Sequence, residues 1–329
     1  MPSGRSSQRI VIAGASSLLG GEVKSLLEET RFAGWDISLV DEESAAGTLT
    51  EAAGEPAVIQ PVEEGTFAWA QLIFFAGSAP FTLANLPAAQ ESGATVIDLS
   101  GAALKLPNMS AWFALEPADK SKKLYAIPSA PALVTAKLLA ALRQARLSRA
   151  SVVFFRPVSE AGRAGIEELE SQTSHLLSFQ SVGQPVFDTQ VAFSLLDHYG
   201  SASRESLQSV RERVRLEISA LGDKIPVQPA IEVLHAPVFY GYTFIANAEL
   251  QSSKTREALA EFLRSSGFAV EGDTTSSTGN LTASGDSAIH LALPESDPAQ
   301  PNTWWFWGAA DNIRLPAATA VKLAEQLIA

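Results

Sequence analysis

The chain has 329 residues, of which 46% are hydrophobic and 18% are charged, and this length is sufficient for two domains with hydrophobic cores. It contains no cysteine, so disulfides, thiolate metal sites and a thiol nucleophile are excluded. The formal net charge of -12 argues against nucleic acid or an anionic membrane as the partner.

The expected location follows from hydropathy. Residues Met1–Arg9 are polar and lack the apolar segment of a signal peptide, and no apolar run is long enough to cross a bilayer. The sequence therefore predicts a cytoplasmic protein. The four histidines are not spaced as metal ligands, so no metal site is expected.

The first informative segment combines an apolar strand, the glycine-rich sequence Gly14–Gly21 and a helix predicted at 22–29. This order opens a dinucleotide-binding unit. Gly14 and Gly20 match the glycines of the tight turn and of helix packing, whereas Ser17 stands where a glycine would let the pyrophosphate approach. The pattern predicts a Rossmann-type fold and leaves nucleotide binding open.

An acidic group follows the next predicted strand, Asp36–Asp41. An acid about twenty residues after the glycines can bond a ribose 2′-hydroxyl, and the successive acids Asp41, Glu42 and Glu43 would repel a 2′-phosphate. No cofactor is certain; NAD or NADP is possible and NAD is favoured, while a solvated acidic loop is the alternative. The candidate cofactor-binding residues are Gly14, Ser16, Ser17, Gly20 and Asp41.

Three further apolar segments are predicted strands, and helices alternate with them. This alternation predicts an α/β fold with a parallel, doubly wound sheet. Small polar residues at the carboxyl ends of such strands mark the usual ligand crevice. The strands are Leu72–Phe75, Thr95–Asp98 and Leu124–Ile127, and the helices cover about 84–91 and 132–144.

The last of these strands leads through Pro128 into the start of a helix. A residue at a helix start faces the positive end of the helix dipole, which favours a nucleophile or an anion. Ser129 and Ala130 occupy this position, and alanine has no reactive group. A packed corner between strand and helix is the alternative.

The second half is predicted to be an α+β domain, a mixed sheet covered by helices, whose exposed sheet face would be a natural dimer surface. The segment at 273–287 is rich in Gly, Ser and Thr and is expected to be an exposed loop. The predicted strands are Ser151–Pro157, Ile231–Gly241, Tyr242–Leu250, Ile289–Leu293 and Trp304–Trp307, and the helices cover about 163–179, 206–220, 254–265 and 316–328.

Sequence blocks spread over nearly the whole chain resemble one family. Gly14–Gly20 is similar to its Gly-x-Thr-Gly-x-x-Gly loop, and Ala126–Ala130 lies where it has Ala-Asn-Pro-Asn-Cys. Val158–Leu169 resembles its Val-Ser-Gly-Ala-Gly helix start. Pro237–Thr243 resembles Pro-Val-x-x-Gly-His-Ser, and Trp307–Arg314 resembles Asp-Asn-Leu-Arg-Lys-Gly. The family is that of aspartate-β-semialdehyde dehydrogenase.

The resemblance implies a Rossmann-type, NAD(P)-binding-like domain at 1–130 to which a C-terminal helix at 313–329 returns, an α+β catalytic and dimerisation-type domain at 131–312, and a homodimer. Enzymes of the family use NADP to interconvert aspartyl phosphate and aspartate semialdehyde. A cysteine thiolate attacks the aldehyde, hydride leaves to the nicotinamide, and phosphate cleaves the thioester.

The catalytic positions of the family carry other residues in this chain. The nucleophilic cysteine falls on Ala130 and the general-base histidine on Tyr242. The glutamine that orients the intermediate falls on Arg156, and the substrate-binding arginine falls on His235. Loss of nucleophile and base together removes the acyl-enzyme route, because covalent catalysis needs both. Ser129 with His235 as its base would be a replacement, and Tyr242 would be either a proton donor or a packed ring.

The anion-binding positions are altered as well. A phosphate-binding arginine falls on Leu104, beside Lys105, and the lysine and glycine after Arg314 fall on Leu315 and Pro316. Several cations and one histidine nevertheless predict an anion pocket. The candidate substrate- or anion-binding residues are Arg156, His235, Lys105 and Arg314, and Arg163 is a further cation for this pocket.

The sequence therefore favours a non-catalytic binding or regulatory member of the family, as a homodimer or in a hetero-oligomer with a catalytic relative. The alternative is an NAD(P)-dependent oxidoreductase acting on a semialdehyde-like or other small acid substrate without covalent catalysis. A purely structural partner is the third hypothesis.

Overall fold

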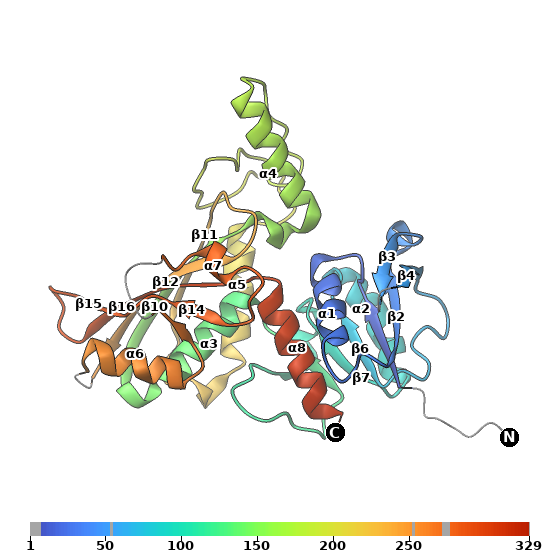
Figure 1. The fold of residues 1–329 in the computed structure, drawn as a ribbon, viewed down its shortest axis with the longest axis horizontal. Coiled ribbons are helices and arrows are strands. Elements are labelled where there is room, and N and C mark those ends of the chain that lie inside the picture. The colour runs from blue at the N-terminus through green and yellow to red at the C-terminus, as the bar shows by residue number, and fades with distance from the viewer. Residues whose placement is uncertain (1–7, 53–54, 252–253, 272–276, 329) are drawn as a thin grey trace. The chain divides into compact units, whose positions relative to one another are not determined.

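The computed structural model describes residues 8–52, 55–251, 254–271 and 277–328. The chain divides into two compact units, the first formed by Met1–Pro128 and Pro316–Ala329 and the second by Ser129–Leu315. Each unit contains one large sheet (Figure 1). No helix in the described ranges combines the length and the apolar character that a membrane crossing requires.

The sheet of the first unit is parallel and has the strand order β5-β2-β1-β6-β7-β9-β8. The order runs outward in both directions from β1, so the sheet is doubly wound and its topological switch point lies between β1 and β6. This confirms the predicted fold class. The strands are β1 (Arg9–Ala13), β2 (Asp36–Asp41), β5 (Gln60–Pro61), β6 (Leu72–Phe75), β7 (Thr95–Asp98), β8 (Ser110–Ala111) and β9 (Leu124–Ala126), beside a hairpin of β3 (Leu49–Ala52) and β4 (Glu55–Val58).

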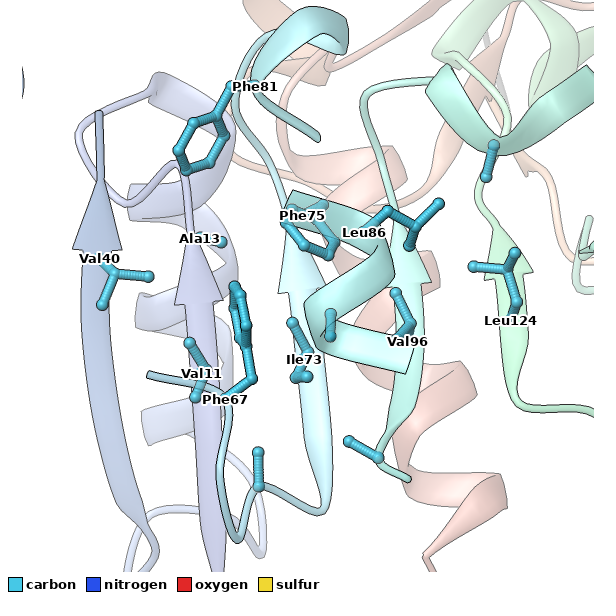
Figure 2. Close-up of a cluster of buried hydrophobic side chains, with 14 residues drawn as sticks. Val11, Ala13, Val40, Phe67, Ile73, Phe75, Phe81, Leu86, Val96 and Leu124 are labelled. Carbon is cyan, nitrogen blue, oxygen red and sulfur yellow. The ribbon is translucent and has the colours of Figure 1, made fainter. Parts of the chain in front are cut away.

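The core of this unit explains the near-continuous apolar strands. Every residue of β6 is buried, as expected for a parallel strand covered on both faces. Figure 2 shows one core cluster, in which side chains from neighbouring strands lie beside Phe81 and Leu86 of α2 (Ala79–Glu91). The strand residues labelled there are Val11, Ala13, Val40, Ile73, Phe75, Val96 and Leu124.

Two helices begin earlier than the sequence predicted, and in both cases a serine explains the difference. Helix α1 spans Leu18–Glu28 because the Ser17 side chain accepts a hydrogen bond from the Gly20 N–H. Helix α2 begins at Ala79 because Ser78 accepts from the Phe81 N–H. Serine satisfies exposed N–H groups at a helix start, so both glycines after Ser17 are helical.

The sheet of the second unit is mixed and has the order β11-β10-β12-β16-β14-β13, with β15 paired to β16. The predicted α+β domain is therefore confirmed. The strands are β10 (Leu147–Arg156), β11 (Ala230–His235), β12 (Tyr242–Leu250), β13 (Ala269–Val270), β14 (Ile289–Leu291), β15 (Glu295–Ser296) and β16 (Thr303–Ala310). The helices are α3 (Ala130–Leu142), α4 (Gly162–Leu177), α5 (Leu207–Ser219), α6 (Arg256–Ser265), α7 (Asn280–Ala283) and α8 (Arg314–Leu327), most of which returns to the first unit.

Two predictions for this half need correction. The strand expected over 231–241 ends at His235, because Pro237 lacks an N–H donor and Gly241 has φ 81°. The expected loop at 273–287 contains α7, and residues 273–276 of that loop lie outside the described residues.

The two faces of this sheet differ in exposure. Phe154 and Phe244 point to the buried face, where α3 contacts β10 and β12 and α5 contacts β11. On the opposite face Val153, Ile245 and Trp307 pair across β10, β12 and β16. We call this half-exposed surface the open sheet face, and it comprises Val153, Phe155, Ile245, Trp305 and Trp307.

Candidate functional site

The glycine-rich loop of the first unit retains two glycines for reasons of packing. Gly14 has φ 90°, and a Cβ on it would lie 2.1 Å from the backbone nitrogen of Gly77. A Cβ on Gly20 would lie 2.3 Å from the carbonyl oxygen of Gly14. No side chain can be accommodated at such distances, so the turn and the start of α1 can pass each other only as glycines.

The other predicted cofactor-binding residues of this loop contact one another or the neighbouring strands. The Ser17 hydroxyl accepts from the Gly20 N–H at 2.8 Å and donates to the Ala76 carbonyl at 2.9 Å. The Asp41 carboxylate accepts from the backbone N–H of Ser16 at 2.8 Å. The structure therefore brings all five predicted residues together at the carboxyl ends of β1 and β2.

In the second unit, candidate residues gather where three strands meet on the buried face. Arg156 and His235 are the last residues of β10 and β11 and are paired in the parallel register. Tyr242 is the first residue of the antiparallel neighbour β12. All three are buried, with Arg156 2% exposed. The predicted association of Arg156 with His235 therefore has a direct cause in strand pairing.

Arg156 is a buried cation with incomplete pairing. Its Nη2 donates to the Glu205 carboxylate and its Nη1 donates to the Tyr199 hydroxyl at 3.4 Å. Its Nε has no hydrogen-bond partner among the described residues. Burial is the largest single influence and lowers the pKa of this guanidinium, but Glu205, Tyr199, Tyr242 and Glu160 together outweigh it. The pKa is therefore raised and the charge is retained.

His235 is neutral and already engaged. Its Nδ1 lies 3.3 Å from the Tyr199 hydroxyl and its Nε2 lies 3.4 Å from the Val191 carbonyl. Burial lowers its pKa from 6.5 to about 4, with Arg156 adding to the effect. Because both ring nitrogens face these groups, the hypothesis that His235 serves as the base of Ser129 finds no support in its hydrogen bonds.

Tyr242 fills the position that the resemblance assigns to a base. Its ring is fully buried and contacts Phe154 edge-on, with ring centroids 5.9 Å apart. Burial raises the pKa of its phenol well above the usual range, and its hydroxyl finds no partner within the described part of the chain. These features favour the packed ring over the proton donor.

The start of α3 carries a carboxylate instead of a nucleophile. Ala130 is its first residue and is buried. The preceding Ser129 donates its hydroxyl and its backbone N–H, the latter at 3.2 Å, to Glu217 of α5. Glu217 is fully buried and also accepts from Arg213 at 3.0 Å. The negative charge favoured at this helix end is thus supplied by the chain itself. Sequence reasoning missed Glu217 because it lies on α5, whose pattern shows only alternating charges.

A cavity of about 100 Å³ adjoins Arg156. Its lining includes a second cation, Arg204. This residue lies with Tyr199 and Glu205 in the segment between α4 and α5, for which the sequence predicted no helix or strand. The cavity is lined by Arg156, Ala161, Val186, Phe187, Tyr199, Ser203, Arg204 and Glu205.

The remaining predicted anion-binding residues do not line this cavity. Arg163 is exposed in the first turn of α4. Arg314 begins α8, where its N–H donates to Asp311 at 2.8 Å. Lys105 is exposed in the first unit, so its part in an anion pocket stays a prediction.

Comparison with known proteins gives a consistent result. The family model described as "Semialdehyde dehydrogenase, NAD binding domain" matches residues 9–126, and "Semialdehyde dehydrogenase, dimerisation domain" matches residues 139–315. The chain is 29% identical to the USG-1 protein homolog of Pseudomonas aeruginosa and 25% identical to aspartate-semialdehyde dehydrogenase of Rickettsia bellii, with 97% of each chain covered. The solved structure of a probable aspartate-semialdehyde dehydrogenase from Pseudomonas aeruginosa is similar, with 27% identity, a TM-score of 0.85 and 98% of both chains covered.

Proposed function

The chain belongs to the semialdehyde dehydrogenase family, and we propose that it is a member that binds a small carboxylate without converting it. The proposal rests on the residues at the two positions that correspond to the family's nucleophile and general base. Ala130 has no reactive group, and Tyr242 is a buried phenol whose pKa is raised. An acyl-enzyme route requires a nucleophile and a base within reach of each other.

The binding half of the proposal rests on Arg156 and its cavity. A guanidinium has five N–H donors, and Tyr199 and Glu205 leave Nε without a partner. A buried donor left unpaired is unfavourable, so an acceptor entering the cavity would relieve it. Arg204 adds a second positive charge, and a carboxylate matches the planar fork of an arginine. The volume of about 100 Å³ limits the ligand to a few heavy atoms around that carboxylate.

Calorimetric titration with malonate is expected to give binding that Arg156→Gln weakens by about ten- to a hundred-fold. The reason is that a hydrogen bond to a charged group contributes about 1.5–3 kcal/mol. In the same preparation, aspartate semialdehyde with NADP and phosphate is expected to show no turnover above the uncatalysed background.

Arg163→Gln is the matched control, because it removes the same charge from an exposed position outside the cavity. It should leave malonate affinity unchanged, and circular dichroism should show that both variants are folded. Measurable turnover of the semialdehyde would contradict the non-catalytic assignment. Equal affinity of wild type and Arg156→Gln would contradict the assigned cavity, and tighter binding of phosphate than of malonate would contradict the carboxylate class.

We further propose that the open sheet face is the contact between two copies of this chain. Its central row, formed by Val153, Ile245 and Trp307, is apolar and half exposed. Residues 139–315, which include this face, match a dimerisation-domain model. Symmetric homodimers bury the same patch on both subunits, and an apolar sheet face suits such a contact.

Ile245→Lys is expected to weaken the dimer by at least about a hundred-fold, because an unpaired ammonium would be buried twice in a symmetric interface. Sedimentation velocity should then give the 34.8 kDa mass of one chain instead of two. The control is Gln90→Lys, which adds the same charge at an exposed position of α2. Wild type sedimenting as a single chain would refute the homodimer and leave a hetero-oligomer with a catalytic relative as the remaining assembly.

A further inference from the structure

We infer that Ser17 closes the crevice in which a Rossmann-type unit receives a dinucleotide, so that this chain retains the fold but binds NAD and NADP only weakly. The family model matched by residues 9–126 carries the description of an NAD binding domain, so the fit of these residues to a dinucleotide can be tested directly. The inference concerns the first unit and is independent of the carboxylate cavity.

The three glycine positions of the nucleotide-binding motif differ in what requires them, since two are required by the fold and one by the ligand. Gly14 must be glycine because a Cβ would lie 2.1 Å from the Gly77 nitrogen, and Gly20 must be glycine because a Cβ would lie 2.3 Å from the Gly14 carbonyl oxygen. The glycine between them serves the approach of the pyrophosphate. This chain has Ser17 at that place. The loop therefore has glycine at the two positions where packing requires it, and serine at the position where a bound pyrophosphate would require glycine.

The Ser17 hydroxyl lies at the topological switch point. It accepts from the Gly20 N–H at 2.8 Å in the first turn of α1 and donates to the Ala76 carbonyl at 2.9 Å, directly after β6. Dinucleotides bind in the crevice between the two strands at which the order reverses, here β1 and β6. The serine thus bridges the two sides of that crevice.

Several backbone donors around Ser17 are also engaged. The Gly14 N–H donates to the Val40 carbonyl at 2.9 Å, and the Ser17 N–H donates to the Gly14 carbonyl at 3.1 Å. The Ser16 N–H donates to Asp41, whose other carboxylate oxygen accepts from the Glu42 N–H at 2.8 Å. A phosphate bound at a helix start is held by backbone N–H groups that point at it. Here the N–H groups of Gly14, Ser16 and Ser17 already have acceptors within the chain.

A dinucleotide would have to displace the serine and both of its hydrogen bonds. Two hydrogen bonds of ordinary strength correspond to an affinity loss of about ten- to a hundred-fold. The acids Asp41, Glu42 and Glu43 would weaken a nucleotide bearing a 2′-phosphate further. The loop and the acidic group after β2 therefore do not fit NADP. They fit NAD only after the two hydrogen bonds of the Ser17 hydroxyl are removed.

The decisive experiment is calorimetric titration of the full chain and of Ser17→Gly with NAD and with NADP. Wild type is expected to give no saturable heat at millimolar dinucleotide. Ser17→Gly is expected to bind NAD at least about tenfold more tightly than wild type and NADP more weakly than NAD. Glycine is tolerated at a helix start, so the variant should fold, and thermal melting monitored by circular dichroism checks this.

Thr255→Gly is the matched control, because Thr255 caps α6 by accepting from the Ala258 N–H and lies in the other unit. It should leave dinucleotide binding as in wild type. Ser17→Ala removes the hydroxyl and keeps the Cβ, so it should give an intermediate gain, and it replaces Ser17→Gly if that variant does not fold. Tight binding of NAD by wild type, or no gain in either Ser17 variant, would overturn the inference. Malonate binding in the second unit should be the same in all of them, which separates this outcome from the proposed function.

Discussion

Replacing Gly14 with alanine is expected to destabilise the first unit by about 2–5 kcal/mol. The residue has φ 90°, a conformation that costs a residue with a Cβ about 1–2 kcal/mol. The added methyl group would also lie 2.1 Å from the nitrogen and 2.4 Å from the Cα of Gly77, and overpacking against backbone costs about 1–3 kcal/mol. Urea unfolding followed by circular dichroism measures the change.

Gly21→Ala is the matched control for this prediction. Gly21 lies within α1, and a Cβ placed on it would meet no atom within 4 Å. The same substitution should therefore stabilise the protein by up to about 1 kcal/mol, because alanine is the better helix former. If both variants had equal stability, Gly14 would not be retained for packing. The contrast between Gly14, which packing requires to be glycine, and Ser17, where a bound pyrophosphate would require glycine, would then be lost.

The fold was predictable from the sequence because its parallel strands are buried on both faces. Such strands appear as short apolar runs, and the runs at Leu72–Phe75 and Thr95–Asp98 coincide with β6 and β7. The helix starts were missed because Ser17 and Ser78 act through side-chain hydrogen bonds that no hydrophobic period records.

The site was predictable only in part. The resemblance placed Arg156 and His235 near each other, and the β10–β11 register explains why they are neighbours. Tyr199, Arg204 and Glu205 could not be anticipated, because they lie in an irregular segment positioned by long-range hydrogen bonds. Periodicity reports on regular elements and carries no information about which loop side chains reach a distant strand.

The neutral, buried His235 makes a large pH dependence of stability the second strong expectation. Its pKa is lowered from 6.5 to about 4 by burial, and Tyr199 and Arg156 are the ionisable groups that face it. Between these two values the unfolded chain binds a proton that the folded chain does not, so stability falls as the pH falls from about 6.5 to about 4. This histidine therefore makes the free energy of unfolding about 3 kcal/mol smaller below about pH 4 than above pH 6.5.

His235→Gln tests this expectation, because glutamine has no proton to gain and can still bond Tyr199 and Val191. The free energy of unfolding at about pH 7 minus that at about pH 4 should be about 3 kcal/mol smaller in the variant than in wild type. Carboxylates such as Glu160, whose pKa is raised by burial, contribute to the pH dependence of both proteins and cancel in the comparison.

His198→Gln is the control, because it removes an imidazole that is 81% exposed. The pH dependence of its stability should be the same as in wild type. If stability fell as much between about pH 7 and about pH 4 in His235→Gln as in wild type, the histidine would be charged in the folded protein. Arg156 would then have a cation beside it, and the carboxylate cavity would have to be reconsidered as a doubly charged site.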